Sequence, residues 1–234
     1  MVVGQKCIFV LKQDELGGKL KKNRQYKGIY AGGDRVSYRG FVLVPEEIIP
    51  IQKPAVKKEK APTASDYKKF ADVAFEVGVR FRDGWRSVIS GQKFEEGDWN
   101  GLQAGHGVSR QHWATRHNPL NCHAITSGQN FHMSLGTTKT IAQYWAYVAK
   151  KYGQDVVDNL LNNEKPSPKL TISYLKEDCR VCYSFLSRRL EEWDRTYKTN
   201  HSAPDVIKWR CENLPKKQAN GVLKVLKMIT EGQI

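Results

Sequence analysis

The sequence has few cysteines and no long apolar run. Five cysteines are spread over 234 residues, an odd number without the dense spacing of a disulfide framework, so we expect mostly free thiols and a reducing compartment. No stretch approaches the roughly 18 apolar residues of a membrane-spanning helix, and the initial MVVGQKCIFVLKQDELGG has no apolar signal region. The sequence therefore predicts a cytoplasmic protein without a membrane partner.

Acidic residues are scarce relative to basic ones. There are 24 Asp and Glu against 38 Lys and Arg, a net charge of +14. Such a balance favours a polyanionic partner, and nucleic acid is the first candidate, because phosphate neutralisation by Lys and Arg drives affinity regardless of base sequence. The alternative is a globular protein that is basic for other reasons. A hydrophobic content of 40% predicts one good core, with room for a small second module.

Composition and turn signals divide the chain into four parts. We expect a small β-rich module, a solvated basic linker, a main domain and a C-terminal helical extension, over residues 1–52, 53–65, 66–200 and 201–234. The strands of the first module are expected at 6–11, 25–31 and 37–44.

Helical periodicity dominates the second half of the chain. A helix is expected to begin near Ser65 or Asp66 and to end before Asp83, and further helices are expected at 138–152, 155–162 and 170–197. Short strands and loops fill residues 85–136. The predicted fold class is α+β, with a compact β-rich site on a helical scaffold.

The segment 104–136 gathers the side chains best suited to chemistry. It holds five of the six histidines and three asparagines, together with Arg110 and Arg116. Imidazole can accept a proton from water or bind a divalent metal, carboxamides can orient the imidazole, and guanidinium groups bind phosphate. Hydrolysis of a phosphodiester requires all three capacities.

The spacing of three of these residues indicates a particular arrangement. His106 follows a plausible strand, Asn121 opens a second strand fifteen residues later, and Asn130 lies nine residues further on, where a helix could begin. Strand, loop, strand and helix with this His, Asn, Asn order resembles the HNH, or ββα-metal, nuclease motif. The resemblance implies that His106 is the general base, that Asn121 orients it and that Asn130 helps to hold a metal ion.

A narrower resemblance covers residues 66–197. The fragments VRFRDGW, AGH, ATRHNPLNCH, N-x-H-x-S and KKYGQDVVDNL occur in the order seen in the phage NinG, or Rap, recombination endonucleases. The resemblance implies an endonuclease that acts in the host cytoplasm on branched or single-strand-containing DNA, such as D-loops and Holliday-type junctions. A homodimer would suit such substrates.

The sequence departs from this family at two pairs of positions. Members usually carry two Cys-x-x-Cys knuckles, and here the matching residues are Ser87, Ser90, Thr126 and Gln129. Hydroxyls and a carboxamide cannot replace thiolates around zinc. We therefore expect no structural zinc, and we expect side-chain hydrogen bonds to join the two loops instead.

A second departure concerns the metal ligands. Many HNH sites place an Asp or His immediately before the catalytic histidine, and this chain has Gly105 there. The remaining candidate ligands are Asn130, His123 and His132, with Asp98 as a further candidate and structural roles for the two histidines left open. An oxygen-rich shell would suit Mg²⁺ or Mn²⁺, and a histidine-rich one would tolerate Zn²⁺ or Ni²⁺.

Four arginines are candidate DNA-binding residues: Arg80, Arg82, Arg110 and Arg116. Arg110 and Arg116 could instead form salt bridges within loops, but few acids lie near this site, which favours phosphate contact. Separately, Cys179 and Cys182 could form half a zinc site completed by Cys211 or His201. We favour core packing, because positions i and i+3 of an apolar helical face are usually buried.

Two function classes remain. The first is a divalent-metal-dependent DNA endonuclease that selects branched structures. The second is a DNA-binding recombination or architectural protein whose nuclease site has decayed, which Gly105 and the missing cysteines allow. The joint presence of His106, Asn121 and Asn130 favours the enzyme.

Overall fold

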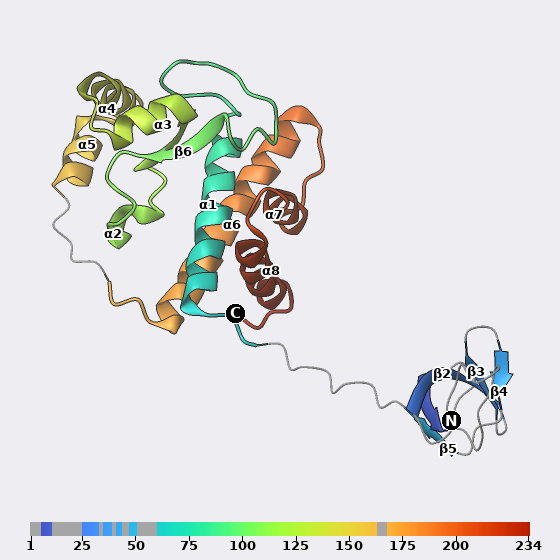
Figure 1. Cartoon of the computed structure of the whole chain (residues 1–234). Coiled ribbons are helices and arrows are strands. Elements are labelled where there is room, and N and C mark those ends of the chain that lie inside the picture. Colours follow the sequence, from blue (N-terminus) through green and yellow to red (C-terminus); the bar gives the residue numbers. More distant parts are fainter. Residues whose placement is uncertain are drawn as a thin grey trace. The chain divides into compact units, whose positions relative to one another are not determined.

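The computed structural model describes the backbone of five strands before residue 51, and both backbone and side chains of residues 60–162 and 168–234. The chain divides into two compact units, residues 1–60 and 61–234 (Figure 1). Most of the expected linker, residues 53–65, lies outside the described residues. The two units are described in turn.

The first unit is an antiparallel five-stranded sheet. Its strands are β1 Lys6–Val10, β2 Gln25–Gly32, β3 Arg35–Tyr38, β4 Phe41–Leu43 and β5 Glu47–Pro50. They lie in the order β4-β3-β2-β1-β5. The first two predicted strands are confirmed to within a residue. The predicted strand at 37–44 forms two short strands instead, and β5 was not predicted.

Helix α1, Ala64–Arg82, is the central element of the second unit. Thr63 accepts a hydrogen bond from the amide of Asp66, and the Asp66 side chain accepts one from the amide of Thr63, which forms a capping box. The apolar residues at helical spacing, Phe70 to Val77, are buried. The predicted helix and its buried face are therefore confirmed, with the start one or two residues earlier than expected.

Three helices pack along α1: α6 Ile172–Tyr197, α7 Ala203–Cys211 and α8 Lys216–Thr230. Gly78 allows α1 and α6 to approach closely, because a Cβ at this position would lie 2.7 Å from the ring of Phe185 and 3.3 Å from the Leu186 backbone. Helices α7 and α8 contribute Val206, Ile207 and Val222 to the same core as α1. The residues expected to form an extension thus complete the main core.

A small two-stranded hairpin also packs against α1, and three helices follow it in the chain. Strands β6 Leu102–His106 and β7 Cys122–Thr126 pair antiparallel, and the short helix α2 Trp113–Arg116 lies in the loop between them. Helices α3 Ser127–Ser134, α4 Thr138–Tyr152 and α5 Gln154–Leu161 follow (Figure 1). The unit is α+β, as predicted. None of the helices described here is long and apolar enough to span a membrane.

Candidate functional site

The strand–loop–strand–helix order predicted for residues 102–134 is present. In the β6–β7 register, His106 lies opposite Cys122 and Gly105 lies opposite His123. Side chains alternate between the two faces of a strand. A Cβ at position 105 would lie 3.3 Å from Oδ1 of Asn130, so Gly105 faces α3, whereas His106 faces α1 and its ring lies 6.5 Å from that of Phe75.

A polar pocket of about 760 Å³ opens beside this hairpin. It brings His106 and Asn130 together with residues from α1, the β6–α2 loop and α7. Its lining includes Glu76, Arg80, Trp99, Gln103, Arg110 and Arg210. The pocket therefore combines a titratable imidazole, a carboxylate and three guanidinium groups.

The ring of His106 is held in one orientation by a backbone carbonyl. Its Nε2 lies 2.9 Å from the carbonyl oxygen of Arg116. A carbonyl can only accept a hydrogen bond, so Nε2 carries the hydrogen and Nδ1 keeps its lone pair. Burial lowers the pKa of His106 below its usual 6.5, and the ring is neutral at pH 7. A neutral, oriented imidazole can accept a proton from water.

Asn121 acts on the loop around His106 and makes no hydrogen bond to its ring. The buried carboxamide accepts from the amide of Val108 at 2.7 Å and donates to the carbonyls of Val108 and Thr115 at 3.0 and 3.1 Å. Because Arg116 follows Thr115 directly, this clamp fixes the carbonyl that orients His106. The predicted direct orientation is therefore replaced by an indirect one through the backbone.

Asn130 lies within α3 and lines the pocket. The helix begins at Ser127, where Thr126 is the N-cap and forms a capping box with Gln129, so the helix starts three residues before Asn130, where the sequence had suggested its beginning. Its Nδ2 donates to Oε1 of Gln103 at 2.8 Å. Its Oδ1 is the atom that lies 3.3 Å from the position of a Cβ on Gly105. This oxygen remains available as an acceptor or metal ligand.

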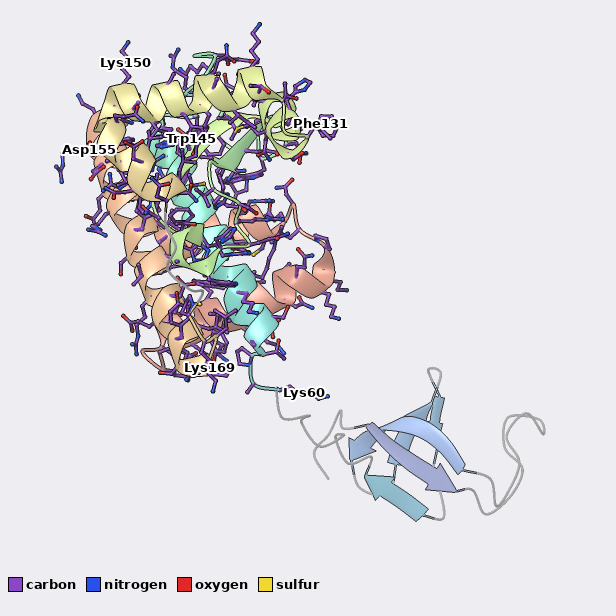
Figure 2. The ribbon with its side chains drawn as sticks, turned by 90° about the vertical axis from the view of Figure 1, so that its left-hand side faces the viewer. Lys60, Phe131, Trp145, Lys150, Asp155 and Lys169 are labelled. Carbon is purple, nitrogen blue, oxygen red and sulfur yellow. The ribbon has the colours of Figure 1, made fainter. Side chains whose placement is uncertain are left out.

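The two histidines expected as further ligands lie away from this pocket. His123 is fully buried, and its Nδ1 accepts a hydrogen bond from Arg82 at 2.8 Å. Its ring packs against those of Tyr147 and Tyr152, with centroids 5.2 and 5.7 Å away. His132 is exposed on α3 beside Phe131, which Figure 2 shows projecting outward from the helix. Neither lines the pocket, so the structure does not bring them together with His106.

The four candidate arginines divide into two pairs. Arg110 is exposed at the rim of the pocket, and Arg80 lies in its wall with 2% exposure. Arg80 donates to the carbonyls of Leu102 and Glu76, both at 2.9 Å. These two residues place positive charge at the pocket.

Arg82 and Arg116 are engaged within the protein. Arg82 donates to Asp83, to the carbonyls of Pro119 and Cys122 and to His123. Arg116 forms a bidentate pair with Asp72 at 2.6 and 2.8 Å. The expectation of few acids near Arg116 is wrong, because α1 brings Asp72, which is remote in sequence, to its guanidinium group. The geometry gives both arginines structural roles instead of phosphate contacts.

Two charged residues of the pocket, Glu76 and Arg210, were not predicted from the sequence. Glu76 comes from α1, and Arg210 comes from α7, outside the expected main domain. The guanidinium groups of Arg210 and Arg80 lie 5.4 and 5.5 Å from the centroid of the Trp99 ring. Helical periodicity places Glu76 among buried residues of α1, which is a weak signal, and no local signal marks Arg210.

The two departures from the family pattern have different consequences. Oγ of Ser87 donates to Oε1 of Gln129 at 2.7 Å, and the amide of Ser90 donates to Oγ of Ser87. The predicted hydrogen-bonded link between the knuckle loops is therefore confirmed. At the other departure, a Cβ on Gly105 would collide with the side chain of Ile125. The apolar side chain of Ile125 therefore fills the space that a metal-ligating side chain at position 105 would need.

The donors around the pocket fit a hard divalent cation better than zinc. Glu76 offers a carboxylate, Asn130 offers an amide oxygen, and water can complete such a shell. Among residues 60–162 and 168–234, only His117, Asp178 and Cys182 bring three His, Cys, Asp or Glu ligand atoms within 4.8 Å of one another. That cluster lies outside the pocket, and the alternative set of Cys179, Cys182, Cys211 and His201 does not assemble.

A hairpin followed by a helix, with a neutral imidazole and arginines around one pocket, defines an α+β protein equipped to bind an anionic ligand. A family model described as NinG, bacteriophage lambda NinG protein, matches residues 49–192. The chain therefore belongs to the NinG family, whose members are recombination-related phage proteins. No curated protein and no solved structure matches it.

Proposed function

We propose that this protein is a metal-dependent DNA endonuclease that cleaves branched recombination intermediates. The observation that carries the proposal is His106, a neutral imidazole whose Nε2 is fixed by a carbonyl and whose Nδ1 carries the lone pair that can accept a proton. The +14 charge and the recombination-related family support DNA as the substrate.

His106 is the proposed general base, and it takes the proton from the attacking water at Nδ1. Its Nε2–H stays on the Arg116 carbonyl throughout, which keeps the ring in the required tautomer. Asn121 is a positioning residue, because its carboxamide holds the loop that carries this carbonyl. Nδ1 lies 3.8 Å from the Cys122 sulfur. Burial raises the pKa of that thiol well above its usual value, so the thiol stays protonated. Its S–H is a weak hydrogen-bond donor to Nδ1, and the attacking water must displace it.

Glu76 and Asn130 are the residues proposed to hold Mg²⁺ or Mn²⁺. Both line the pocket with His106, and both present oxygen donors, which these ions prefer. Such an ion would supply electrostatic stabilisation of the phosphate as negative charge builds up. Arg80, Arg110 and Arg210 surround the same space and can bind the phosphate and its neighbours.

One observation favours a second function, a DNA-binding recombination protein with a decayed site. Ile125 occupies the space into which a ligand at position 105 would extend. In that case the pocket would bind phosphates and leave them intact. The protein would then retain salt-dependent DNA affinity without cleavage.

The two functions separate in a cleavage assay with purified full-length protein. A four-way junction, a D-loop and a linear duplex of the same sequence are each incubated with Mg²⁺ or Mn²⁺. The nuclease proposal expects cleavage that requires the ion and is faster on the branched substrates. Binding without cleavage under every metal condition would support the decayed site, and equal rates on all three substrates would contradict the proposed selectivity.

A further inference from the structure

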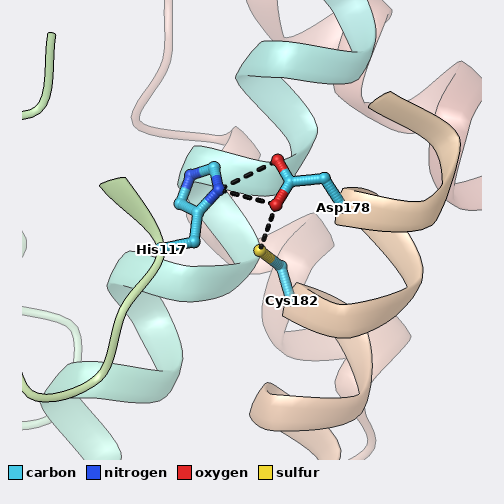
Figure 3. Close-up of side chains that lie close together, drawn as sticks. All are labelled: His117, Asp178 and Cys182. Atoms are coloured by element: carbon cyan, nitrogen blue, oxygen red, sulfur yellow. Dashed lines mark hydrogen bonds and ion pairs between the residues drawn. The ribbon is translucent and has the colours of Figure 1, made fainter. Parts of the chain in front are cut away.

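A second group of polar side chains lies beside the hairpin pocket, about one turn away along α1. Asp72, one of its members, is four residues before Glu76 of the pocket and therefore lies on the same face of the helix. His117 follows α2, Asp178 and Cys182 come from α6, and Asp72 comes from α1. Figure 3 shows His117 and Cys182 directed toward the carboxylate of Asp178. The side chains of His117 and Asp178 are only 7% and 12% exposed, and Cys182 is buried. Nothing in the proposed nuclease chemistry uses this group.

The distances within the cluster are close to those of a metal shell. Nδ1 of His117 lies 3.0 and 2.9 Å from the two carboxylate oxygens of Asp178, and Sγ of Cys182 lies 4.0 Å from Oδ1 of Asp178. Ligand atoms around tetrahedral zinc, at bonds of about 2.0–2.3 Å, are separated by about 3.3–3.8 Å. The ligand atoms of the three residues all lie within 4.8 Å of one another, so shifts on the order of 1 Å would bring them to these separations.

Two features of the cluster go beyond an ordinary ion pair. Asp178 and Cys182 are four residues apart on α6, so both side chains lie on one helical face, as paired metal ligands on helices do. Oδ2 of Asp178 is buried without a hydrogen-bond partner, although Nδ1 of His117 is near. The single N–H at Nδ1 bonds to Oδ1 and leaves this second oxygen unsatisfied.

Asp72 completes the pattern from the far side of the imidazole. Its Oδ1 lies 3.0 Å from Nε2 of His117, and Arg116 binds the same carboxylate. A histidine that binds a metal through one nitrogen typically donates its other N–H to a carboxylate, which fixes the ring and makes it a better donor. His117 has this arrangement, with Nδ1 directed at Asp178 and Cys182.

We propose that His117, Asp178 and Cys182 form a divalent metal site for Zn²⁺, with water as the fourth ligand and Asp72 as the positioning carboxylate. Imidazole, thiolate and carboxylate are the donors that zinc accepts in tetrahedral sites. The bound ion replaces two protons, one from Nδ1 of His117 and one from the Cys182 thiol, so the net charge of the cluster does not change. The proposed site would revise the expectation of a protein without structural zinc, with a ligand set that the sequence did not indicate.

The site would connect the loop after α2 to α6. His117 is the residue after Arg116, whose carbonyl orients His106. A metal here would hold that loop in place, and the hydrogen bond between Ser87 and Gln129 joins the two loops at the knuckle positions independently. The proposal does not depend on the nuclease activity.

Cobalt substitution in the full-length protein tests the site directly. Co²⁺ added to metal-stripped protein should give a thiolate-to-cobalt charge-transfer band and the intense visible bands of tetrahedral coordination, saturating at one ion per chain. Zn²⁺ should abolish both sets of bands. A wild-type protein that shows neither would overturn the proposal, and this outcome requires no variant.

Matched cysteine variants assign the sulfur. Cys182→Ser should remove the charge-transfer band, whereas Cys179→Ser should keep it, because Cys179 is equally buried on the same helix but bonds to the carbonyl of Tyr67. Asp72→Asn should keep the band and weaken cobalt affinity on the order of 10–100-fold. A band that survives Cys182→Ser, or an affinity unchanged by Asp72→Asn, would contradict the proposed geometry.

Discussion

The buried carboxylate of Asp83 should be one of the most important single groups for stability. It is fully buried and accepts hydrogen bonds from Arg82 Nε, Arg82 Nη2 and the amide of Ala124, all at 2.8 Å. It thereby ties the end of α1 to β7. Asp83→Asn should leave the Arg82 charge without its partner, and breaking a buried pair in this way costs about 3–5 kcal/mol.

The expected effect is large for a unit of this size. At about 2–4 °C per kcal/mol, Asp83→Asn should lower Tm by roughly 6–20 °C, measured by circular dichroism at pH 7. The control is Glu177→Gln, which breaks an exposed pair with Arg180 whose side chains are 61% and 54% exposed. Such pairs contribute about 0–1 kcal/mol. If the two variants had similar Tm values, the structural role of Asp83 would be refuted.

The same residue predicts an acid dependence of stability. Burial alone would raise the pKa of Asp83, but His123 and the Arg82 guanidinium outweigh it and hold the pKa at about 2, below the usual 3.8. A lowered carboxyl pKa stabilises the fold above pH 4, and this contribution is lost as the pH falls through 2. The loss amounts to about 2 kcal/mol. Urea unfolding between pH 5 and 2 should show a shallower decline in Asp83→Asn than in the wild type.

Three further outcomes follow from the site and its supports. Gln129→Ala should lower the free energy of unfolding by about 1–3 kcal/mol, because Ser87 loses its acceptor; a value within about 0.5 kcal/mol of wild type would contradict the link between the loops. Arg110→Ala should reduce the slope of the salt dependence of DNA binding by about one unit, whereas Arg82→Ala should lower Tm and leave that slope unchanged. A lower Tm in Arg110→Ala and a smaller slope in Arg82→Ala would contradict these assignments. Because burial lowers the pKa of His106 below 6.5, cleavage should persist at pH 6.5 and decline only at lower pH. A pH–rate profile with its inflection point above pH 7 would point to another base.

Local sequence signals predicted the secondary structure well. The capping box at Thr63 and the apolar spacing from Phe70 to Val77 fix α1, and α4 matches the predicted 138–152. These features depend on neighbours within a few residues, which a sequence displays directly. The β6–β7 hairpin followed by α3 was also predicted, from the spacing of His106, Asn121 and Asn130.

The composition of the site was predicted less well, for a physical reason. Residue type indicates which chemistry a side chain can perform, whereas its partner is set by packing between elements remote in sequence. The sequence around Arg116 shows no ion-pair partner for it, but in the fold α1 brings Asp72 to within 2.6 Å of its guanidinium group. Glu76 and Arg210 reach the pocket from α1 and α7, which are far apart in the sequence of the unit. No spacing rule connects these two residues to His106.

The most direct test of the account is single-turnover cleavage of a branched DNA by His106→Ala and by His112→Ala. His112 is an exposed histidine of the same loop that does not line the pocket, so it controls for the loss of an imidazole. With Mg²⁺ or Mn²⁺ and matched DNA occupancy, His106→Ala should cleave on the order of 10²–10⁴-fold more slowly than wild type, whereas His112→Ala should cleave at the wild-type rate. Cleavage by His106→Ala at the wild-type rate would contradict the account.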